Sequence, residues 1–254
     1  MPTAHTMTVA FVLTRSELLR FFRRPARVIA AIGTAAGLWL LLGSGFAESF
    51  RPAALESSSY AKFLLPSMMT LVAVFSAVFS SISVIEQRNT GWLRCVLVSP
   101  APRLSIALGA TAGGALPAFI QAAILLPAGL LVGVTLCAAD VALVLLALAL
   151  TCIAMTALGL LFAWRSETTA AFHAVMTLVF LPMWLLSGAF FPPDQAASWL
   201  GWLMRLNPLT WCTLSIRGPI TDSFDPIYLA LTAVFALVML ASATLVVGRS
   251  RLVQ

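Results

Sequence analysis

Long apolar runs separated by short polar loops dominate the pattern of this chain. Each run has about 20 residues or more, the length that a helix needs to cross the hydrocarbon core of a bilayer. In chain order they predict six membrane-spanning helices, over residues 27–47, 62–85, 104–136, 141–164, 168–191 and 227–248. The third run is long and contains several glycines and prolines, so we expect a kinked or tilted helix there.

Two further segments show the periodicity of short amphipathic helices. Residues 7–24 place apolar side chains on one side and Glu17 with several arginines on the other, which predicts a helix lying on the membrane surface. Residues 86–103 form a polar interruption with a helical pattern that starts at Thr90 and stops at Ser99-Pro100. We interpret residues 86–103 as a coupling helix, a rigid element outside the bilayer through which a soluble partner can push on two spans.

The segment between the last two runs, residues 192–226, has its own pattern. Trp199, Trp202 and Leu206 share one helical face, and Asn207-Pro208 interrupts the helix before a second short one. One interpretation is an aromatic belt that anchors the bundle at the outer interface. The other, which we adopt for the fold, is a re-entrant helical hairpin that covers the outer end of a pathway.

Composition and charge place the chain in a membrane. Hydrophobic residues make up 61% of it and charged residues 9%, and its mean hydropathy is +1.00. We therefore predict an all-α integral membrane protein with a single transmembrane domain over residues 1–254. The first apolar run is longer than a signal-peptide core, so we expect it to be retained.

The distribution of basic residues predicts the orientation. Most arginines lie near the N-terminus, in residues 86–103 and at the C-terminus, and the positive-inside rule puts these parts in the cytoplasm. Four basic residues fall outside under this topology: Arg51, Lys62, Arg205 and Arg217. We expect a plasma membrane, the inner membrane of a bacterium, and no nucleic-acid binding, because the basic residues do not gather on one soluble face.

The sequence lacks the residue motifs that several kinds of chemistry require. Lys62, the only lysine, follows Ala61, so no G-x-x-x-x-G-K-[ST] loop for ATP exists, and neither H-E-x-x-H nor G-x-S-x-G occurs. The chain is predicted not to be an enzyme, to hold no metal and to need no cofactor of its own. Gln121 and His173 are the polar groups at mid-span, and each could make an interhelical hydrogen bond or line a transport pathway.

Three blocks of sequence resemble the type-2 ATP-binding-cassette exporter permeases, including the daunorubicin-resistance and nodulation-factor export permeases. The blocks read EQRNTGWLR with LVSP at 86–100, LSGAFFP at 186–192 and LNPLT at 206–210. The order of elements also resembles that family: a surface helix, six spans, a cytoplasmic loop after span two, and an outer hairpin between spans five and six.

The resemblance implies the membrane subunit of an ATP-driven exporter for a hydrophobic or amphipathic substrate, such as a drug, lipid, glycolipid or polysaccharide. Its partners would be two copies of a separate P-loop ATPase subunit, which would bring ATP and Mg²⁺, a second permease copy or a paralogue, and membrane lipids. The implied ATPase contact comprises Glu86, Arg88, Gly91, Trp92, Leu93, Arg94, Ser99 and Pro100. The surface helix would add Arg15, Glu17, Arg20, Arg23 and Arg24. The implied outer gate comprises Gly188, Phe191, Pro192, Asn207, Pro208 and Trp211.

Two other functions stay open at this point. The chain could be a secondary transporter driven by an ion gradient, although it shows no strong internal repeat. It could also be a membrane scaffold that recruits a soluble partner without transporting anything. For Glu86 and Arg88 the alternative to a partner contact is a plain charge at the membrane boundary.

Overall fold

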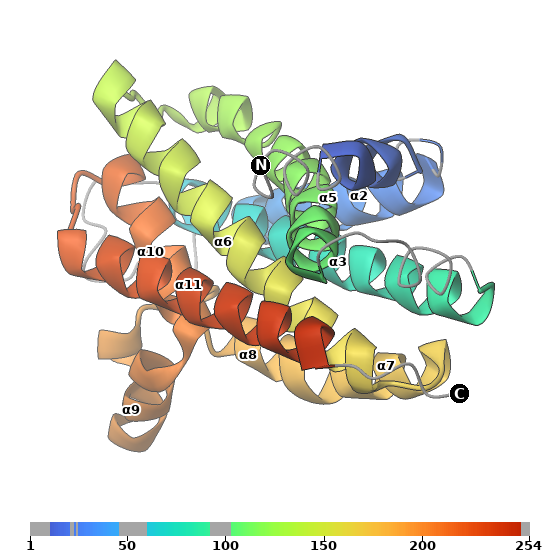
Figure 1. The fold of residues 1–254 in the computed structure, drawn as a ribbon. Helices are drawn as coiled ribbons and strands as arrows, with labels where there is room; N and C mark the ends of the chain where they lie inside the picture. Colours follow the sequence, from blue (N-terminus) through green and yellow to red (C-terminus); the bar gives the residue numbers. More distant parts are fainter. Residues whose placement is uncertain (1–10, 21–22, 24, 46–59, 92–102, 250–254) are drawn as a thin grey trace.

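The structure, a computed structural model, describes residues 11–20, 23, 25–45, 60–91 and 103–249, and these residues contain helices and no strand (Figure 1). Residues 11–20 are helical. The helices that follow are α2 (Pro25–Gly45), α3 (Tyr60–Asn89), α5 (Arg103–Ala123), η2 (Leu126–Val132), α6 (Ala138–Arg165), α7 (Thr169–Val175), η3 (Met176–Phe180), α8 (Leu181–Leu185), η4 (Pro193–Gln195), α9 (Ser198–Leu206), α10 (Pro208–Ile220) and α11 (Pro226–Arg249). The predicted all-helical membrane fold is confirmed at this level.

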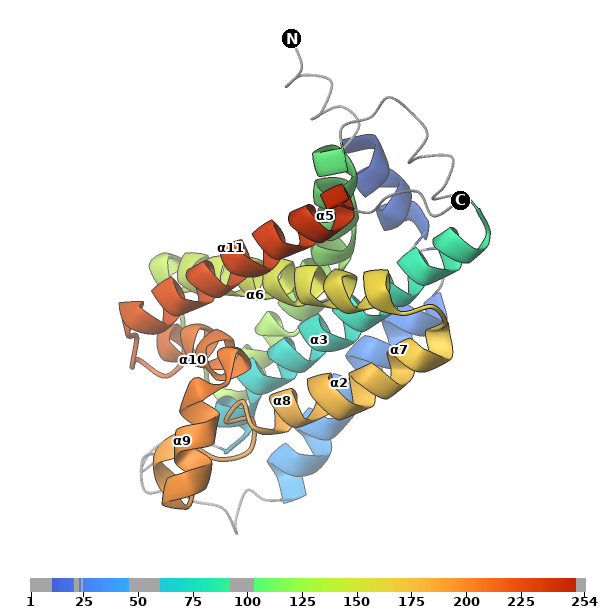
Figure 2. The same cartoon turned by 60° about the horizontal axis from the view of Figure 1, so that its bottom comes forward.

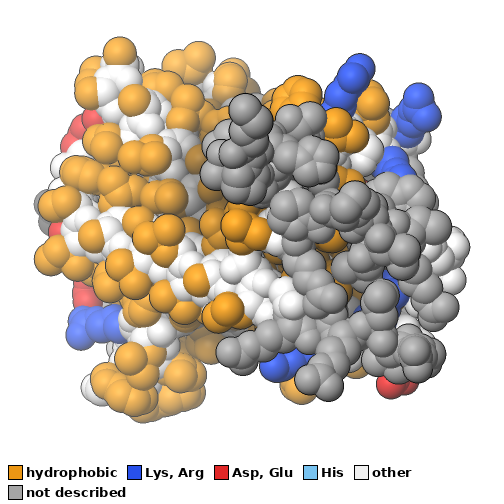
Figure 3. Space-filling view, in the orientation of Figure 1, with side chains coloured by type: hydrophobic (Ala, Val, Ile, Leu, Met, Phe, Trp, Pro, Cys, Tyr) orange, Lys and Arg blue, Asp and Glu red, His pale blue; other side chains and the backbone are white. Residues whose placement is uncertain are grey.

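Helix α3 is the centre of the bundle. In its most apolar window 78% of the residues are buried inside the protein, compared with 22% in α2 and 28% in α11. It packs against α2, α5 and α6, and Figure 2 shows it running between α6 and α2. The outer helices instead expose apolar side chains, which cover much of the described surface in Figure 3. Apolar side chains on the outside of the protein are expected where lipid tails, and not water, surround it.

Small residues allow α3 to approach its neighbours closely. A Cβ atom on Gly114 of α5 would overlap Ser80 of α3, and one on Gly159 of α6 would overlap the hydroxyl of Ser81. Without a hydrophobic driving force between helices in lipid, such close backbone approach is a main source of helix association. Gly114 of the third predicted span therefore serves close packing against α3.

The helices occupy the predicted apolar runs, with altered bounds. Helix α3 continues past the predicted end at Ile85 to Asn89, so Glu86 to Arg88 belong to the helix and not to a loop. The third predicted span is divided into α5 and the 3₁₀ helix η2, which has Pro127 in its first turn and ends at Val132, followed by Gly133 with a φ of 74°. Proline at the first turn and a left-handed glycine at the end explain both boundaries.

The fifth predicted span, 168–191, differs most. The helical stretch Thr169–Leu185 contains the π-helical turn η3 just before Pro182, whose missing N–H and ring disturb regular α-helical bonding. At 1.5 Å per residue this stretch is ~25 Å long. Five helices of the described residues are long and apolar enough to cross a membrane, and Thr169–Leu185 is a shorter apolar helix. A sixth crossing stays a prediction.

Candidate functional site

Two ends of the bundle carry the polar contacts that bear on function. One, which we call the Gln87 end, contains Glu17, Gln87 and Arg88 with the C-termini of α3 and α6. The other, the Arg217 end, contains Tyr60, Phe63 and Arg217 with α9, α10 and the start of α11. They lie at opposite ends of α3 because Gln87 is in its last turn and Tyr60 is its first residue.

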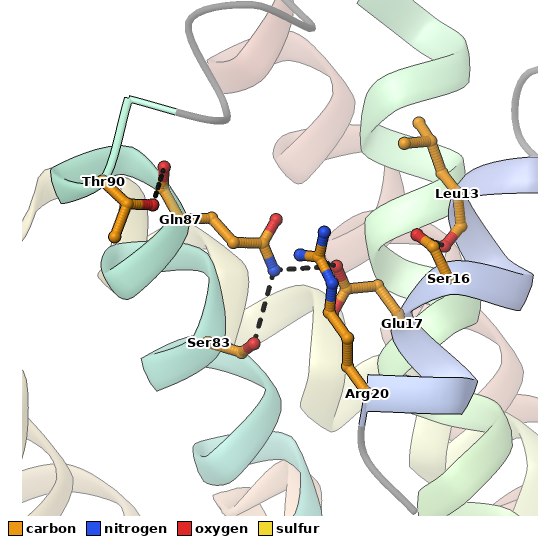
Figure 4. Close-up of polar contacts among 7 residues, drawn as sticks. All are labelled: Leu13, Ser16, Glu17, Arg20, Ser83, Gln87 and Thr90. Carbon is orange, nitrogen blue, oxygen red and sulfur yellow. Dashed lines mark hydrogen bonds and ion pairs between the residues drawn. The ribbon is translucent and has the colours of Figure 1, made fainter. Parts of the chain in front are cut away.

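At the Gln87 end the helix of residues 11–20 is bonded to α3. The amide nitrogen Nε2 of Gln87 donates to Glu17 Oε1 at 2.7 Å and to Ser83 Oγ at 3.3 Å, and Arg20 Nη1 lies 3.6 Å from Glu17 Oε1 (Figure 4). Gln87 is buried, although its amide is polar, because these partners satisfy it. The prediction that Glu17 lies on the outward polar face of the surface helix is therefore wrong, because Glu17 faces the bundle.

The same short helix also lies on α5. Thr14 Oγ1 donates a 3.4 Å hydrogen bond to the carbonyl oxygen of Gly109, and a Cβ on Gly113 would overlap the side chain of Glu17. On the other side, Phe11, Val12 and Leu19 are exposed, at 68%, 59% and 49%. Arg15 and Arg23 are exposed too. The helix thus packs one face against the bundle, and its other face exposes apolar and basic side chains on the surface of the protein.

Arg88 joins the end of α3 to the end of α6. Its Nη1 donates to the carbonyl oxygen of Trp164 at 3.1 Å, and its Nη2 donates to that of Ser166. The last carbonyl groups of a helix have no partner within the helix and carry a negative partial charge, so a guanidinium is favourable there. Arg88 is half-buried and held by the bundle, while its neighbour Glu86 is half-buried in the same turn.

Gly91 follows α3 in a left-handed conformation, with a φ of 80°. Its N–H donates to the carbonyl oxygen of Arg88 at 3.2 Å, and a Cβ placed on it would meet nothing within 4 Å. A glycine in this position ends a helix without steric cost. The remaining predicted contact residues, namely Arg24, Trp92, Leu93, Arg94, Ser99 and Pro100, lie outside the described residues, as do residues 92–102 of the predicted coupling helix.

The residues predicted for an outer gate come together at the Arg217 end. Asn207 caps α10, since its Oδ1 accepts from the N–H of Leu209 at 3.1 Å, and its Nδ2 donates to the carbonyl oxygen of Met183 at 2.6 Å. Trp211 Nε1 donates to the carbonyl oxygen of Arg205 at 2.8 Å. Pro208 opens α10, and the turn at Gly188 has a φ of 73°. Phe191 and Pro192 are half-buried beside that turn.

Arg217 is the residue of this end that hydropathy alone did not identify. It is 6% exposed, its Nη2 donates to Ser67 Oγ at 2.8 Å and to the carbonyl oxygen of Gly188 at 2.9 Å, and its Cζ lies 3.8 Å from the ring centre of Phe63. Its sequence signal is a single charge inside α10, between the apolar Ile216 and Gly218-Pro219. The structure makes it the link between α3, the Gly188 turn and α10.

The two mid-span polar residues have different surroundings. Gln121 is buried, and its Nε2 donates to Ser76 Oγ and to the carbonyl oxygen of Pro117, both at 3.1 Å. It therefore makes an interhelical hydrogen bond. His173 is exposed on α7, and its side chain makes no hydrogen bond to the described residues. In the described part of the chain no group of three His, Cys, Asp or Glu side chains is placed to hold a metal ion.

Comparison with known proteins adds a family relationship. A family model described as ABC-2 type transporter matches residues 8–220. A putative transport permease, ycf38, of Cyanophora paradoxa is 31% identical over 211 residues, which cover 82% of this chain and 72% of the relative. A probable multidrug ABC transporter permease, YbhR, of Escherichia coli K12 is 26% identical over 151 residues, which cover 59% of this chain and 41% of the relative.

Proposed function

The chain belongs to the ABC-2 type transporter family, and from this membership we propose that it is the membrane subunit of an ATP-driven exporter of a hydrophobic or amphipathic substrate. The substrate classes that fit are drugs, lipids, glycolipids and polysaccharides. The subunit lies in a plasma membrane, the inner membrane of a bacterium, with both termini in the cytoplasm. The stretch Thr169–Leu185 makes the sixth crossing.

One observation supports this function above the others: the central helix α3 is bonded at one end to the helix of residues 11–20. In the proposal the Gln87 end faces the cytoplasm, and residues 11–20 with residues 86–103 contact a separate P-loop ATPase subunit. A displacement of residues 11–20 would reach α3 through the hydrogen bond between Glu17 and Gln87. A displacement of residues 86–103 would reach α3 directly, because Gln87 is part of that helix. Since α3 packs against α2, α5 and α6, it would then move the whole bundle.

The ATPase subunit supplies the ATP and Mg²⁺ chemistry, in two copies, and a second permease completes the transporter. The second permease is another copy of this chain or a paralogue. Exposed apolar side chains on α2 and on the α7–α8 stretch, including Ile29, Leu41 and Leu178, are available for that permease and for lipid. Closure of the two ATPase subunits on nucleotide would draw the two coupling helices together and tilt α2, α3 and α7–α8 so that a path opens outward.

The test is co-purification of this chain with a P-loop ATPase. This chain is expressed in its own host, purified in mild detergent, the proteins that co-purify are identified, and ATP hydrolysis is measured. We expect a stoichiometric ATPase whose yield falls at least fivefold with Trp92→Ala in residues 86–103. Trp199→Ala is the matched control, because Trp199 is 71% exposed at the opposite end, and it should leave the yield unchanged.

Three results would contradict the proposal. Recovery of this chain alone, without ATPase activity, would favour a scaffold. Transport that depends on membrane potential and not on ATP would favour an ion-driven transporter. Equal ATPase yields for Trp92→Ala and Trp199→Ala would show that residues 86–103 do not contact the ATPase.

A further inference from the structure

The Arg217 end contains a cavity of about 670 Å³. Its wall combines aromatic and aliphatic side chains, such as Phe63, Trp211 and Leu214, with the basic groups of Lys62 and Arg217. Binding sites for small molecules commonly have volumes of ~300–1,000 Å³ and mix an apolar lining with a few polar groups. The size and lining therefore suit a small-molecule ligand.

Arg217 is charged, deeply buried and incompletely bonded. Only its Nη2 donates hydrogen bonds to described residues, and its Nε is buried without an acceptor among them. A guanidinium has five N–H donors, so this one retains capacity for a further acceptor. Its contact with the Phe63 ring offsets part of the desolvation, but a ring carries no counter-charge.

Among the described residues, the other charges around the cavity leave its wall positive. Arg205 and Asp194 pair with each other at 2.6 Å on the exposed rim, so they cancel. Lys62 is half-buried in the wall and makes no ion pair with the described residues. Asp222 is exposed at the cavity and is the remaining acidic residue of its lining, against the two cations Lys62 and Arg217.

From these observations we propose that the cavity binds the anionic headgroup of an amphipathic molecule. A phosphate or carboxylate oxygen accepts from N–H groups of Arg217 that have no acceptor among the described residues, Lys62 supplies a second positive charge, and the apolar part of the molecule lies along Phe63 and Trp211. Guanidinium groups match the geometry of phosphate and carboxylate oxygens, which favours these anions over a spherical halide. The assignment of this cavity as the substrate site of an exporter rests on the function proposed above, whereas the binding of an anionic amphipathic molecule does not.

The binding is tested on the full chain in a nonionic maltoside detergent. Dihexanoyl phosphatidic acid is titrated by calorimetry, with dihexanoyl phosphatidylcholine and inorganic phosphate as comparisons. We expect phosphatidic acid to bind at least tenfold more tightly than the zwitterionic lipid and than phosphate alone. Equal binding of the two lipids, or no binding of phosphatidic acid, would overturn the proposal, and equally tight binding of inorganic phosphate would replace the amphipath with a free-phosphate site.

Three variants connect the binding to the cavity. Arg217→Met should weaken phosphatidic acid binding at least tenfold, Lys62→Gln about threefold, and Leu214→Trp at least threefold, because it narrows the apolar part of the cavity. Arg165→Gln, an exposed arginine at the other end of the bundle, should bind like the unmodified chain. Because Arg217→Met also removes bonds to Ser67 and Gly188, the folded variants Lys62→Gln and Leu214→Trp decide the outcome if it does not fold.

Unchanged affinity in both Lys62→Gln and Leu214→Trp would place the lipid elsewhere and overturn the proposal. This result would leave ATPase co-purification unaffected. Conversely, loss of the ATPase partner would leave the lipid titration unaffected, so the failure of one proposal is distinguishable from the failure of the other.

Discussion

The side chain of Gln87 donates a 2.7 Å hydrogen bond to the carboxylate of Glu17, which lies 70 residues earlier in the chain. Gln87 stands in the last turn of the central helix α3, and Glu17 belongs to the short helix of residues 11–20. The bond therefore joins the two parts of the Gln87 end that are proposed to meet the ATPase. Figure 4 shows that Arg20 approaches the same carboxylate, so Glu17 is shared between both helices.

Replacing Gln87 by leucine is expected to loosen the helix of residues 11–20. The change leaves the Glu17 carboxylate with fewer donors in a partly buried site, at a cost of about 1–3 kcal/mol. Amide hydrogen exchange of residues 11–20 should become faster by about tenfold or more, while exchange in α11 stays the same. Asn89→Leu, an exposed change one half-turn further along α3, is the control. Unaltered exchange in the Gln87 variant would show that the bond does not hold the helix.

Arg88 is expected to stabilise the fold through the end of α6. Arg88→Ala removes two hydrogen bonds to carbonyl groups and should lower the free energy of unfolding by about 2 kcal/mol. Arg88→Lys should recover only part of this loss, because a single ammonium cannot reproduce the fork of a guanidinium. The exposed Arg165→Ala should change stability by less than about 0.5 kcal/mol. Thermal unfolding in detergent measures all three, and an Arg88→Ala variant as stable as Arg165→Ala would contradict the capping role.

The sequence predicts most of the fold because helices that cross a membrane are long apolar runs, which are easily recognised in a sequence. Apolar runs of membrane length and proline–glycine boundaries locate α2, α3, α6 and α11 within a few residues. The continuation of α3 through Glu86, Gln87 and Arg88 was missed because these residues are polar, and hydropathy assigns such residues to loops. Two of them bond to partners far away in the sequence, Glu17 and the carbonyl groups at the end of α6, and hydropathy does not register such contacts.

The Arg217 end shows a second limit of hydropathy. A charge between two spans is assigned to water, whereas Arg217 is buried against Phe63 and Ser67, which lie about 150 residues earlier. The shortening of the fifth span has a local cause that is visible in the sequence, Pro182, which follows the π-helical turn and disturbs regular α-helical bonding. Gly188 and Asn207 were named from the family resemblance, and they occupy a left-handed turn and the cap of α10, two positions that favour particular residue types.

Close packing between α3 and α5 gives a further prediction. Gly114→Val would place methyl groups into Ser80 and Thr156, so the helices must separate, and we expect a loss of about 2–4 kcal/mol or failure to express. Gly33→Val is the matched control, because a Cβ there meets nothing within 4 Å. Size-exclusion profiles and thermal unfolding distinguish the two. A Gly114 variant that behaves like the Gly33 variant would show that the approach of the helices is not needed for stability.

Gly91 offers the sharpest separation of stability from coupling, because the chain contains a second glycine with the same strain and no proposed contact. Gly91 and Gly133 have φ values of 80° and 74°, and a Cβ on either meets nothing within 4 Å. Valine at each position should therefore cost a similar ~1–2 kcal/mol from backbone conformation alone.

Only Gly91 leads directly from α3 into residues 92–102, so its conformation sets the direction in which the chain leaves the central helix. With equal expression, Gly91→Val should reduce the ATP hydrolysis of the purified complex or the yield of the ATPase at least fivefold, while Gly133→Val retains both. Gly91→Asn should retain most of the activity, because asparagine tolerates the left-handed conformation. If the two valine variants lose the same fraction of ATPase activity and yield, strain alone accounts for the effect, and Gly91 has no role in coupling.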